Sequence, residues 1–289
     1  MASGKLRALV LGANGMAGHT ICLYLKTQGH DVIGFARKPS RIVESFVGDV
    51  RETEALRRRI VDGAFDVVIN CVGILNADAD RDRAQAIFIN ALFPHLLAAH
   101  IEGLPTQVVH LSTDCVFSGR RGLYREDDLR DGETFYDRSK ALGELEDNLN
   151  LTLRTSIVGP DLEPAGIGLL NWFMRQEGEV KGYTRAIWNG QTTLQLAKTI
   201  EYGALRRIGG LYNVVPKVAI SKFELLQLFN RHLRGDAVHI EPVPGLTIDK
   251  SLLRTRHALD CPVPEIPEMI AELAAWMREH RTLYPHYVL

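Results

Sequence analysis

A tyrosine and a lysine four positions apart, Tyr136 and Lys140, could carry out acid–base chemistry. Apolar residues at helical spacing predict a helix over residues 140–148, and side chains four apart share one helix face, roughly 6 Å apart at their β-carbons. A free tyrosine has a pKa near ~10, but a neighbouring ammonium stabilises the phenolate and lowers that pKa. Tyr136 could then protonate an oxygen that gains charge. Because an ordinary amphipathic helix also produces this spacing, the pair needs support from a cofactor site.

Two hydroxyl residues, Ser112 and Thr113, complete the candidate catalytic set. They follow residues 107–111, an apolar run that predicts a strand. Ligands bind at the carboxyl ends of strands in a doubly wound sheet, although both residues also suit a plain turn. A carbonyl reductase needs one donor to hold the substrate oxygen and another to protonate it. Tyr136 lies 24 residues after Ser112, as such a pair of donors would require.

A glycine-rich segment near the N-terminus predicts a dinucleotide site. The apolar residues 6–11 lead into Gly12, Gly15 and Gly18, and residues 20–25 have a helical pattern. A buried strand, a glycine turn and a helix bind a pyrophosphate, because glycines let the backbone close on it at the positive helix N-terminus. The Gly-x-x-Gly-x-x-Gly spacing indicates the short-chain dehydrogenase/reductase type of nucleotide fold.

The residues after the second predicted strand, 31–35, bear on the choice of cofactor. Arg37 and Lys38 follow that strand, and no acidic residue stands there. An acidic residue at this point usually binds the ribose hydroxyls of NAD, whereas a basic one accommodates the 2′-phosphate of NADP. The planar fork of Arg37 suits a phosphate. Two basic loop residues are often only solvated, but their position favours NADPH.

Other polar residues have two readings. Asp49 precedes a helix predicted at about 51–61, so it could lie beside the adenine or cap that helix. The predicted helix at 83–100 carries Asn90 on a face with Ile87 and Ala91. A packed structural amide would explain Asn90 equally well, so we leave it out of the catalytic set.

The composition excludes several classes of protein. With 34 basic and 35 acidic residues in 289, no broad attraction to nucleic acid or an anionic membrane is expected. The four cysteines are widely spaced and the ten histidines form no recognisable set, so we predict free thiols and no metal site. No apolar run approaches the ~18 residues that span a bilayer, and the short start leaves no room for a signal peptide. We expect a cytoplasmic protein.

Three motifs in this order resemble those of a known family. The glycine turn, Ser-Thr-Asp-x-Val-Phe-x-Gly at residues 112–119 and Tyr-x-x-x-Lys are similar to those of the extended short-chain dehydrogenase/reductases, above all the dTDP-4-dehydrorhamnose reductases. The likeness is detailed over residues 6–159 and thins beyond. It implies an α/β Rossmann fold, with a doubly wound parallel sheet and a smaller substrate-binding region. The implied activity is NADPH-dependent reduction of the C4 ketone of a nucleotide-linked 4-keto-6-deoxyhexose, in bacterial-type polysaccharide precursor synthesis.

The resemblance also implies individual roles. Thr113 would hold the carbonyl oxygen, with Ser112 as a second donor. Tyr136 would protonate that oxygen, and Lys140 would bind the nicotinamide ribose while lowering the tyrosine pKa. The residues that would contact NADP are Gly12, Asn14, Gly15, Met16, Arg37, Asp49, Val50, Cys71, Val72, Gly73, Tyr136 and Lys140.

The predicted elements divide the chain in two. Residues 1–159 would form the NADP-binding Rossmann domain, completed by 192–216, which reads as a helix at 193–205 and a late strand. Residues 160–191 and 217–289 would form the substrate-binding region, with helices at 222–233 and 267–280 and an aromatic tail at 282–287 that could dock on the body. The partner would be a nucleotide sugar, and a homodimer is compatible with the sequence. Candidate substrate contacts are Trp172, Arg185 and Trp188, although such aromatics are more often core.

Departures from the family pattern leave alternatives open. Cys115 stands where 4,6-dehydratases have a glutamate, and a buried thiol cannot replace that acid/base at neutral pH, so dehydration is disfavoured. Trp188-Asn189 replaces the usual Asp-Gln, which leaves the sugar open. A nucleotide-sugar epimerase is a rival function, but such enzymes favour NAD and Arg37 argues against them. The other rival is a non-catalytic NADP-binding regulatory subunit, like that of methionine adenosyltransferase, which would keep similar motifs.

Overall fold

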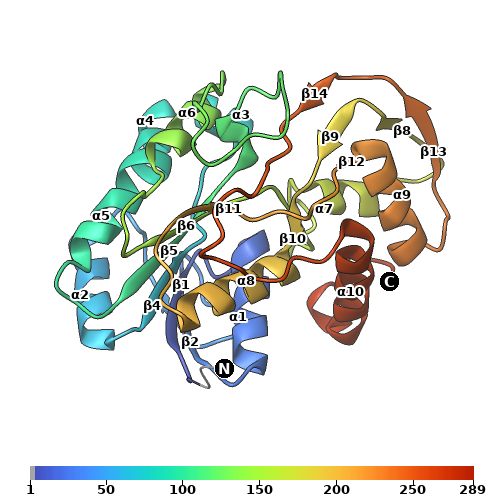
Figure 1. Ribbon diagram of the computed structural model, residues 1–289. Helices are drawn as coiled ribbons and strands as arrows, with labels where there is room; N and C mark the ends of the chain where they lie inside the picture. The colour runs from blue at the N-terminus through green and yellow to red at the C-terminus, as the bar shows by residue number, and fades with distance from the viewer. Residues whose placement is uncertain (1–3) are drawn as a thin grey trace.

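A seven-stranded parallel sheet forms the centre of the computed structural model, which describes residues 4–289 (Figure 1). Its strands are β1 Arg7–Leu11, β2 Asp31–Ala36, β3 Ser45–Val47, β4 Val67–Asn70, β5 Gln107–Ser112, β6 Leu151–Arg154 and β11 Gly210–Asn213. Their order is β11-β6-β5-β4-β1-β2-β3, and all neighbours are parallel. The chain runs outward from β1 to β3 and then returns to the other side of β1. This order confirms the predicted doubly wound α/β fold.

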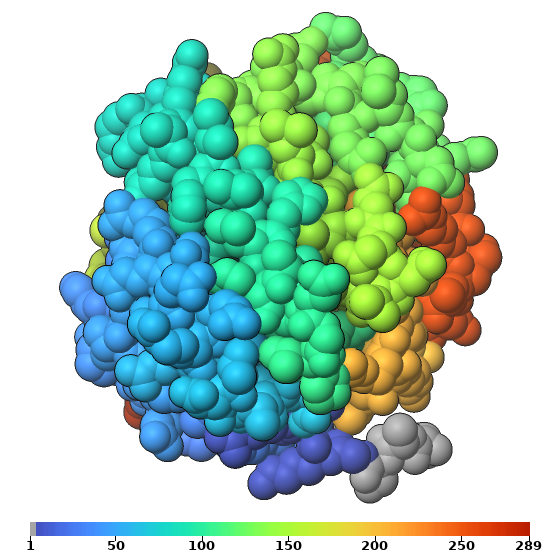
Figure 2. Space-filling view, turned by 90° about the vertical axis from the view of Figure 1, so that its left-hand side faces the viewer, coloured from blue at the N-terminus to red at the C-terminus, as the bar shows by residue number. Residues whose placement is uncertain are grey.

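Helices cover both faces of the sheet, because successive strand residues point to opposite sides. In β1, Ala8 and Val10 belong to the apolar cluster that contains α1 (Met16–Thr27) and α8 (Thr193–Leu205) residues. Leu9 and Leu11 belong to the cluster on the other face, with residues of α2 (Thr53–Gly63) and α5 (Phe93–His100). A strand buried on both faces is apolar throughout. Figure 2 shows the outer surface of the α2 and α5 layer, built mainly by the first half of the chain.

The segment between β4 and β5 is helical but not regular. It contains α3 (Asn76–Arg81), α4 (Arg83–Ala86), a π-helical turn η1 (Ile87–Leu92) and α5. The helix predicted at 83–100 is therefore present with a π turn inside it. Asn90 and Ala91 are both buried, at 0% and 8% exposed, whereas Ile87 is 51% exposed, so the predicted shared face is wrong for Ile87. A π turn is wider than an α turn and changes which residues align along the helix.

Smaller sheets and helices from the second half pack beside the main sheet (Figure 1). They share one apolar core with α1 and α8, through residues such as Phe173, Phe229 and Met277. The predicted helices at 193–205 and 222–233 match α8 and α9. The helix predicted at 267–280 differs from α10 by one residue at each end. The remaining elements are β7 Ile157–Val158, α7 Leu169–Met174, β8 Glu179–Tyr183, β9 Ala186–Trp188, β10 Gln191–Thr192, β12 Ile220–Ser221, α9 Lys222–Leu233, β13 His239–Val243, β14 Ile248–Asp249, α10 Ile266–Glu279 and the 3₁₀ turns η2 Asp114–Val116 and η3 Arg281–Leu283.

The helix that carries the tyrosine–lysine pair, α6, is Phe135–Leu142. The helix predicted over 140–148 is thus wrong beyond Leu142. A capping box, in which Thr134 and Asp137 each bond the other's backbone N–H, fixes its start. Beyond its end Glu144 turns inward to pair with Arg154. The helical spacing of apolar residues in 143–148 therefore did not indicate a helix.

Several chemical features of the described residues bear on function. Within residues 4–289, no helix is both long and apolar enough to cross a membrane. The four cysteines are free, and Cys22 and Cys261 are buried. Over the same described range, no group of three or more His, Cys, Asp or Glu side chains is arranged to hold a metal ion.

Candidate active site

The glycine turn lies at the point where the strand order reverses, between β1 and β4. Gly12 follows β1 with φ +79°, a conformation that side chains rarely adopt, and its backbone N–H donates to the Phe35 carbonyl at 2.9 Å. A Cβ on Gly18 would overlap the Gly12 carbonyl, so α1 packs directly on the turn. Cys71 and Val72, which follow β4, contact the position that a Gly12 Cβ would occupy. This crevice is where doubly wound sheets bind dinucleotides.

The loop after β2 is fixed to the glycine turn by Asn14. Its side-chain amide donates to the carbonyls of Lys38 and Pro39, at 2.9 and 3.2 Å. Arg37 in the same loop is exposed. Its charge also lies close enough to help lower the pKa of Asp49. A cation is therefore available near the turn, where a 2′-phosphate would lie in this type of fold.

Asp49 is committed to a neighbour within the chain. Its carboxylate accepts from the backbone N–H of Arg51 at 2.9 Å and from the Arg51 guanidinium at 3.0 and 2.7 Å. Hydrogen bonds from Arg51 are the main cause that lowers the Asp49 pKa. Asp49 closes the turn before α2, but the prediction that it caps this helix is wrong, because the N-cap residue is Glu52. Val50 beside it is buried.

Tyr136 and Thr113 meet at the carboxyl edge of the sheet. The Thr113 side chain lies close enough to Tyr136 to affect the tyrosine pKa. The Thr113 hydroxyl accepts from the Cys115 backbone N–H at 3.1 Å and donates to the Asp114 carboxylate at 3.1 Å. Tyr136 and Lys140, on α6, are 7% and 5% exposed. Two hydroxyls from separate elements are thus adjacent, as the carbonyl-reductase interpretation requires.

The expected lowering of the Tyr136 pKa is wrong for this structure. Burial raises the pKa of the Tyr136 phenol, and the nearby Cys115, Asp114 and Asp137 raise it further, against a smaller lowering by the nearby Thr113 side chain. Removal of the phenol from water disfavours the phenolate. Tyr136 is therefore held as a neutral O–H, which is the form of a proton donor.

Lys140 lies one helical turn after Tyr136 on α6, and its ammonium is bound to the sheet. Its Nζ donates to the Leu111 carbonyl at 2.7 Å. Burial lowers the pKa of Lys140 to about 8, although Glu144 and Cys71 act in the opposite direction. Lys140 is thus charged at neutral pH but close to losing its proton.

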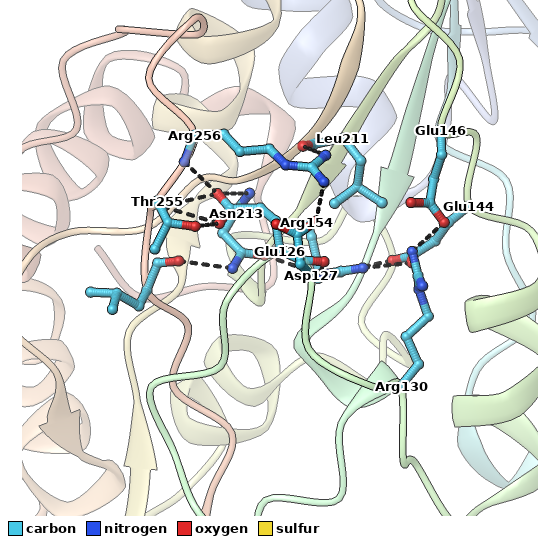
Figure 3. A network of polar contacts seen from close by, with 11 residues as sticks. Glu126, Asp127, Arg130, Glu144, Glu146, Arg154, Leu211, Asn213, Thr255 and Arg256 are labelled. Carbon is cyan, nitrogen blue, oxygen red and sulfur yellow. Dashed lines mark hydrogen bonds and ion pairs between the residues drawn. The ribbon is translucent and has the colours of Figure 1, made fainter.

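Ser112 is not available as the second donor that the sequence suggested. Its hydroxyl donates to Glu144 Oε1 at 2.6 Å. The Glu144 carboxylate also pairs with the guanidinium of Arg154, through contacts of 2.8 and 2.7 Å, and with Arg130 (Figure 3). A buried carboxylate needs every such donor, because it has left water. Ser112 therefore supports the strand end, and Thr113 alone of the two faces Tyr136.

Asn90 is the positioning residue that sequence reasoning left out. Its side chain donates to the Ile74 carbonyl at 2.8 Å and to the Ser139 hydroxyl at 3.0 Å, and accepts from the Ile74 N–H at 2.9 Å. It thereby joins the loop after β4 to α6. The signal in the sequence was a lone amide within an apolar helical run, which is the pattern of a buried polar group with fixed partners.

Two residues near Tyr136 restrict the chemistry. Burial and the charge of Asp114 raise the pKa of Cys115 to about 12, so its thiol stays neutral. This agrees with the expectation that Cys115 cannot replace a dehydratase glutamate. Lys250 follows β14, and its Nζ lies 3.6 Å from the Asp137 carboxylate. It therefore places a cation near the carboxyl edge of the sheet.

The aromatic residues considered as substrate contacts differ in environment. Trp188 is 5% exposed and belongs to the main apolar core, whereas Trp172 is 36% exposed on α7. Arg185 is exposed between β8 and β9. Trp188 is thus a core residue, in line with the usual role of such aromatics.

A glycine turn at the switch point and a buried tyrosine–lysine helix at the adjacent strand end define the class of the fold. It is that of the extended short-chain dehydrogenase/reductases. Within that class, the chain belongs to the family described as RmlD substrate binding domain, which matches residues 6–259.

Individual relatives agree with this family. The probable low-salt glycan biosynthesis reductase Agl14 of Haloferax volcanii is 27% identical over 93% of this chain and 97% of its own length. The dTDP-4-dehydrorhamnose reductase of Mycolicibacterium smegmatis is 30% identical over 48% of this chain. The matches to that reductase and to the Bacillus subtilis spore coat polysaccharide biosynthesis protein SpsK span only 40% and 51% of those relatives.

Solved structures share the fold. The dTDP-4-dehydrorhamnose reductase of Bacillus anthracis, solved in complex with NADP, superposes with a TM-score of 0.79 over 94% of this chain and all of that one, at 21% identity. At that identity the likeness concerns the fold alone.

Proposed function

We propose that this protein reduces the C4 ketone of a nucleotide-linked 4-keto-6-deoxyhexose with NADPH. The observation that carries the proposal is that the Thr113 and Tyr136 side chains lie near each other at the strand edge beside the glycine turn. A ketone oxygen at that point would receive two hydrogen bonds, one of them from a group able to give up its proton. Preorganised donors of this kind supply a large part of the rate in reductions of carbonyls. The family and the glycan-biosynthesis reductase among its relatives support this class of substrate.

The residues at the glycine turn suit a dinucleotide. Gly12 and Gly18 leave the backbone of the turn without side chains, and Asn14 holds the basic loop against it. We propose that Gly12, Gly15 and Met16 bind the pyrophosphate, Arg37 the 2′-phosphate, and Cys71, Val72 and Gly73 the nicotinamide half. Val50 would pack near the adenine, with Asp49 acting through the turn that it closes. When bound, NADPH supplies the hydride.

In the proposed reaction, Tyr136 donates its phenolic proton to the oxygen that becomes the C4 hydroxyl. Thr113 holds that oxygen during the transfer. Lys140 stabilises the phenolate that remains until solvent restores the proton. Residues 160–191 and 217–289 would cover the sugar and nucleotide, while 1–159 with 192–216 would carry the cofactor.

The test is NADPH oxidation followed at its absorbance band, with dTDP- and UDP-4-keto-6-deoxyhexoses as separate substrates and NADH in parallel. Turnover with either sugar would support the reductase, and the faster one would identify the nucleotide. No turnover with either, despite tight NADPH binding, would contradict it and favour the non-catalytic regulatory role. Protein that purifies with bound NAD would favour the epimerase.

Arg37→Ser should shift the cofactor preference. Loss of a charge-assisted hydrogen bond to a 2′-phosphate costs about 1.5–3 kcal/mol, or roughly ten- to a hundredfold in affinity. We expect the dissociation constant of NADPH to rise by that factor and that of NADH to stay nearly constant. The measurement is fluorescence titration with both dinucleotides. Arg41→Ser removes another exposed cation of the same loop and should change neither, so equal effects of the two variants would count against the assignment.

The pH dependence of turnover should reflect Lys140. Its pKa of about 8 means that the ammonium is lost as the pH rises through that value. Since the neutral amine cannot stabilise a phenolate, we expect turnover to be constant at about pH 6–7 and to fall roughly tenfold per pH unit above the pKa. Lys140→Met should be slow at every pH and lack this decline. A wild-type profile that stayed flat to pH 9 would contradict the role.

A further inference from the structure

A buried histidine joins the glycine turn to the end of the chain. His19, at the end of the first turn of α1, is fully buried. Its Nδ1 lies 2.9 Å from the Gly15 carbonyl oxygen, and its Nε2 lies 3.0 Å from the Tyr284 hydroxyl. Tyr284 follows η3 and is 1% exposed. The predicted docking of the aromatic tail is therefore observed, and one of its contacts leads to the glycine turn.

The partners of the His19 ring determine its tautomer. The Gly15 carbonyl can only accept, so Nδ1 must carry the hydrogen. A neutral ring then presents a lone pair at Nε2, to which the Tyr284 O–H donates. Burial lowers the pKa of His19, in keeping with the neutral ring. Loss of the Tyr284 hydroxyl would leave Nε2 with only the Thr20 hydroxyl, at 3.5 Å, and so would weaken the hold on this ring orientation.

This arrangement controls the direction of a peptide group at the start of α1. The Gly15 carbonyl accepts both the His19 backbone N–H, at 3.0 Å, and its ring Nδ1–H. Because the peptide unit is planar and trans, a fixed Gly15 carbonyl fixes the Met16 N–H in the opposite direction. The first N–H groups of a helix have no acceptor within it and are those that bind anions.

We infer that Tyr284 and His19 are positioning residues for the pyrophosphate-binding end of α1, so that the C-terminal tail helps to set the affinity for the dinucleotide. The inference rests on the cofactor of the proposed function and not on the sugar. Neither residue would touch the substrate. Their effect would be a Met16 N–H held in the direction that a bound pyrophosphate needs.

The same tail provides a matched control in Tyr287. This residue is also buried, at 7% exposed, and its ring stacks on Tyr284. Its hydroxyl donates to the Asn171 side chain at 2.7 Å and accepts from the Asp161 N–H at 3.0 Å, so it anchors the loop before α7. Neither of these partners lies on α1. Tyr287→Phe therefore removes a buried tail hydroxyl without disturbing the His19 contacts.

The experiment compares Tyr284→Phe, Tyr287→Phe and wild type, each titrated with NADPH and NADH by fluorescence and each melted thermally. One hydrogen bond corresponds to roughly three- to tenfold in affinity. We expect Tyr284→Phe to weaken binding by that factor and Tyr287→Phe to leave it unchanged, while both lower the melting temperature by similar amounts. Equal affinities in all three proteins, or equal weakening in both variants, would overturn the inference.

His19→Phe supplies a second and independent test. It keeps a flat buried ring but loses both hydrogen bonds, and we expect it to weaken binding at least as much as Tyr284→Phe. If Tyr284 acts through His19, the double variant should bind no worse than His19→Phe alone. Additive losses of dinucleotide affinity in the double variant would overturn the inference that Tyr284 acts through His19. Both dinucleotides carry the pyrophosphate, so wild type that binds only NADH would contradict the NADP assignment but would still allow the test of Tyr284 and His19. Wild type that binds neither dinucleotide would overturn the cofactor assignment and the positioning role together.

Discussion

Tyr136→Phe should reduce turnover by roughly 10² or more while leaving NADPH affinity nearly unchanged. The phenol lies near Thr113 and carries its proton across the physiological range, since burial raises its pKa. Phenylalanine fills the same volume, so the loss would concern the proton and not the packing. The measurement is steady-state NADPH oxidation with the best nucleotide sugar, together with a fluorescence titration of NADPH.

A matched control for this variant is Tyr212→Phe. Tyr212 lies on the edge strand β11 and is also 7% exposed. Its hydroxyl donates to the Gly209 carbonyl at 3.0 Å. It should keep wild-type turnover. Thr113→Val would test the second hydroxyl and should also slow the reaction, because the substrate oxygen would lose one donor. Full activity in Tyr136→Phe would exclude Tyr136 as the proton donor.

Local spacing was enough to predict the parts of this site that lie close in sequence. The glycine turn, the strand end at residues 112–113 and the Tyr136–Lys140 pair each depend on a few neighbouring residues, and each occupies the predicted kind of element. The doubly wound sheet was implied by the glycine turn and by the resemblance of the three motifs to a known family, and strands that alternate with helices are typical of such a sheet. Boundaries failed where a distant partner decided the conformation, as at Glu144, whose pairing with Arg154 ends the helical run.

Contacts between residues far apart in sequence could not be predicted. The hydrogen-bond partners lie 32 positions away for Ser112 (Glu144), 49 positions away for Asn90 (Ser139) and 265 positions away for His19 (Tyr284). Each is a buried polar side chain whose role depends on which partner the fold brings to it. A single sequence shows that a polar residue stands in an apolar run, but not which distant group satisfies it.

The ion pair behind Ser112 illustrates how such contacts support the site. Arg154 and Glu144 have side chains that are 0% and 1% exposed, and Arg154 also bonds the Glu126 carbonyl and the Asn213 side chain (Figure 3). The Glu126 carboxylate in turn accepts from the backbone N–H groups of Asn213 and Thr255. The network thereby joins β6 and β11 to the segment after β14. These buried charged residues therefore stabilise the carboxyl edge of the sheet, where Ser112 and Thr113 lie.

Glu144→Gln should therefore destabilise the fold strongly. It leaves the Arg154 guanidinium buried without its carboxylate, and loss of one partner of a buried pair costs about 3–5 kcal/mol. Burial alone raises the Glu144 pKa, but bonds from Arg154, Ser112 and Arg130 outweigh it, so the folded pKa lies below the ordinary value. The stabilisation is then complete above about pH 4.3 and is lost as the pH falls through the folded pKa. The measurement is the free energy of unfolding in urea at pH 7 and pH 4.

The exposed partner of the same network gives the control. Glu146 pairs with Arg130 but its side chain is 51% exposed, so Glu146→Gln should cost less than about 1 kcal/mol. The double variant Glu144→Leu, Arg154→Leu removes both buried charges and should recover much of the loss, because well-packed apolar residues can replace a buried pair. If Glu144→Gln proved no more costly than Glu146→Gln, the buried pair would not be what holds the strand ends. A large loss that the double variant reverses would attribute the cost to the unpaired Arg154 charge and not to the missing carboxylate itself.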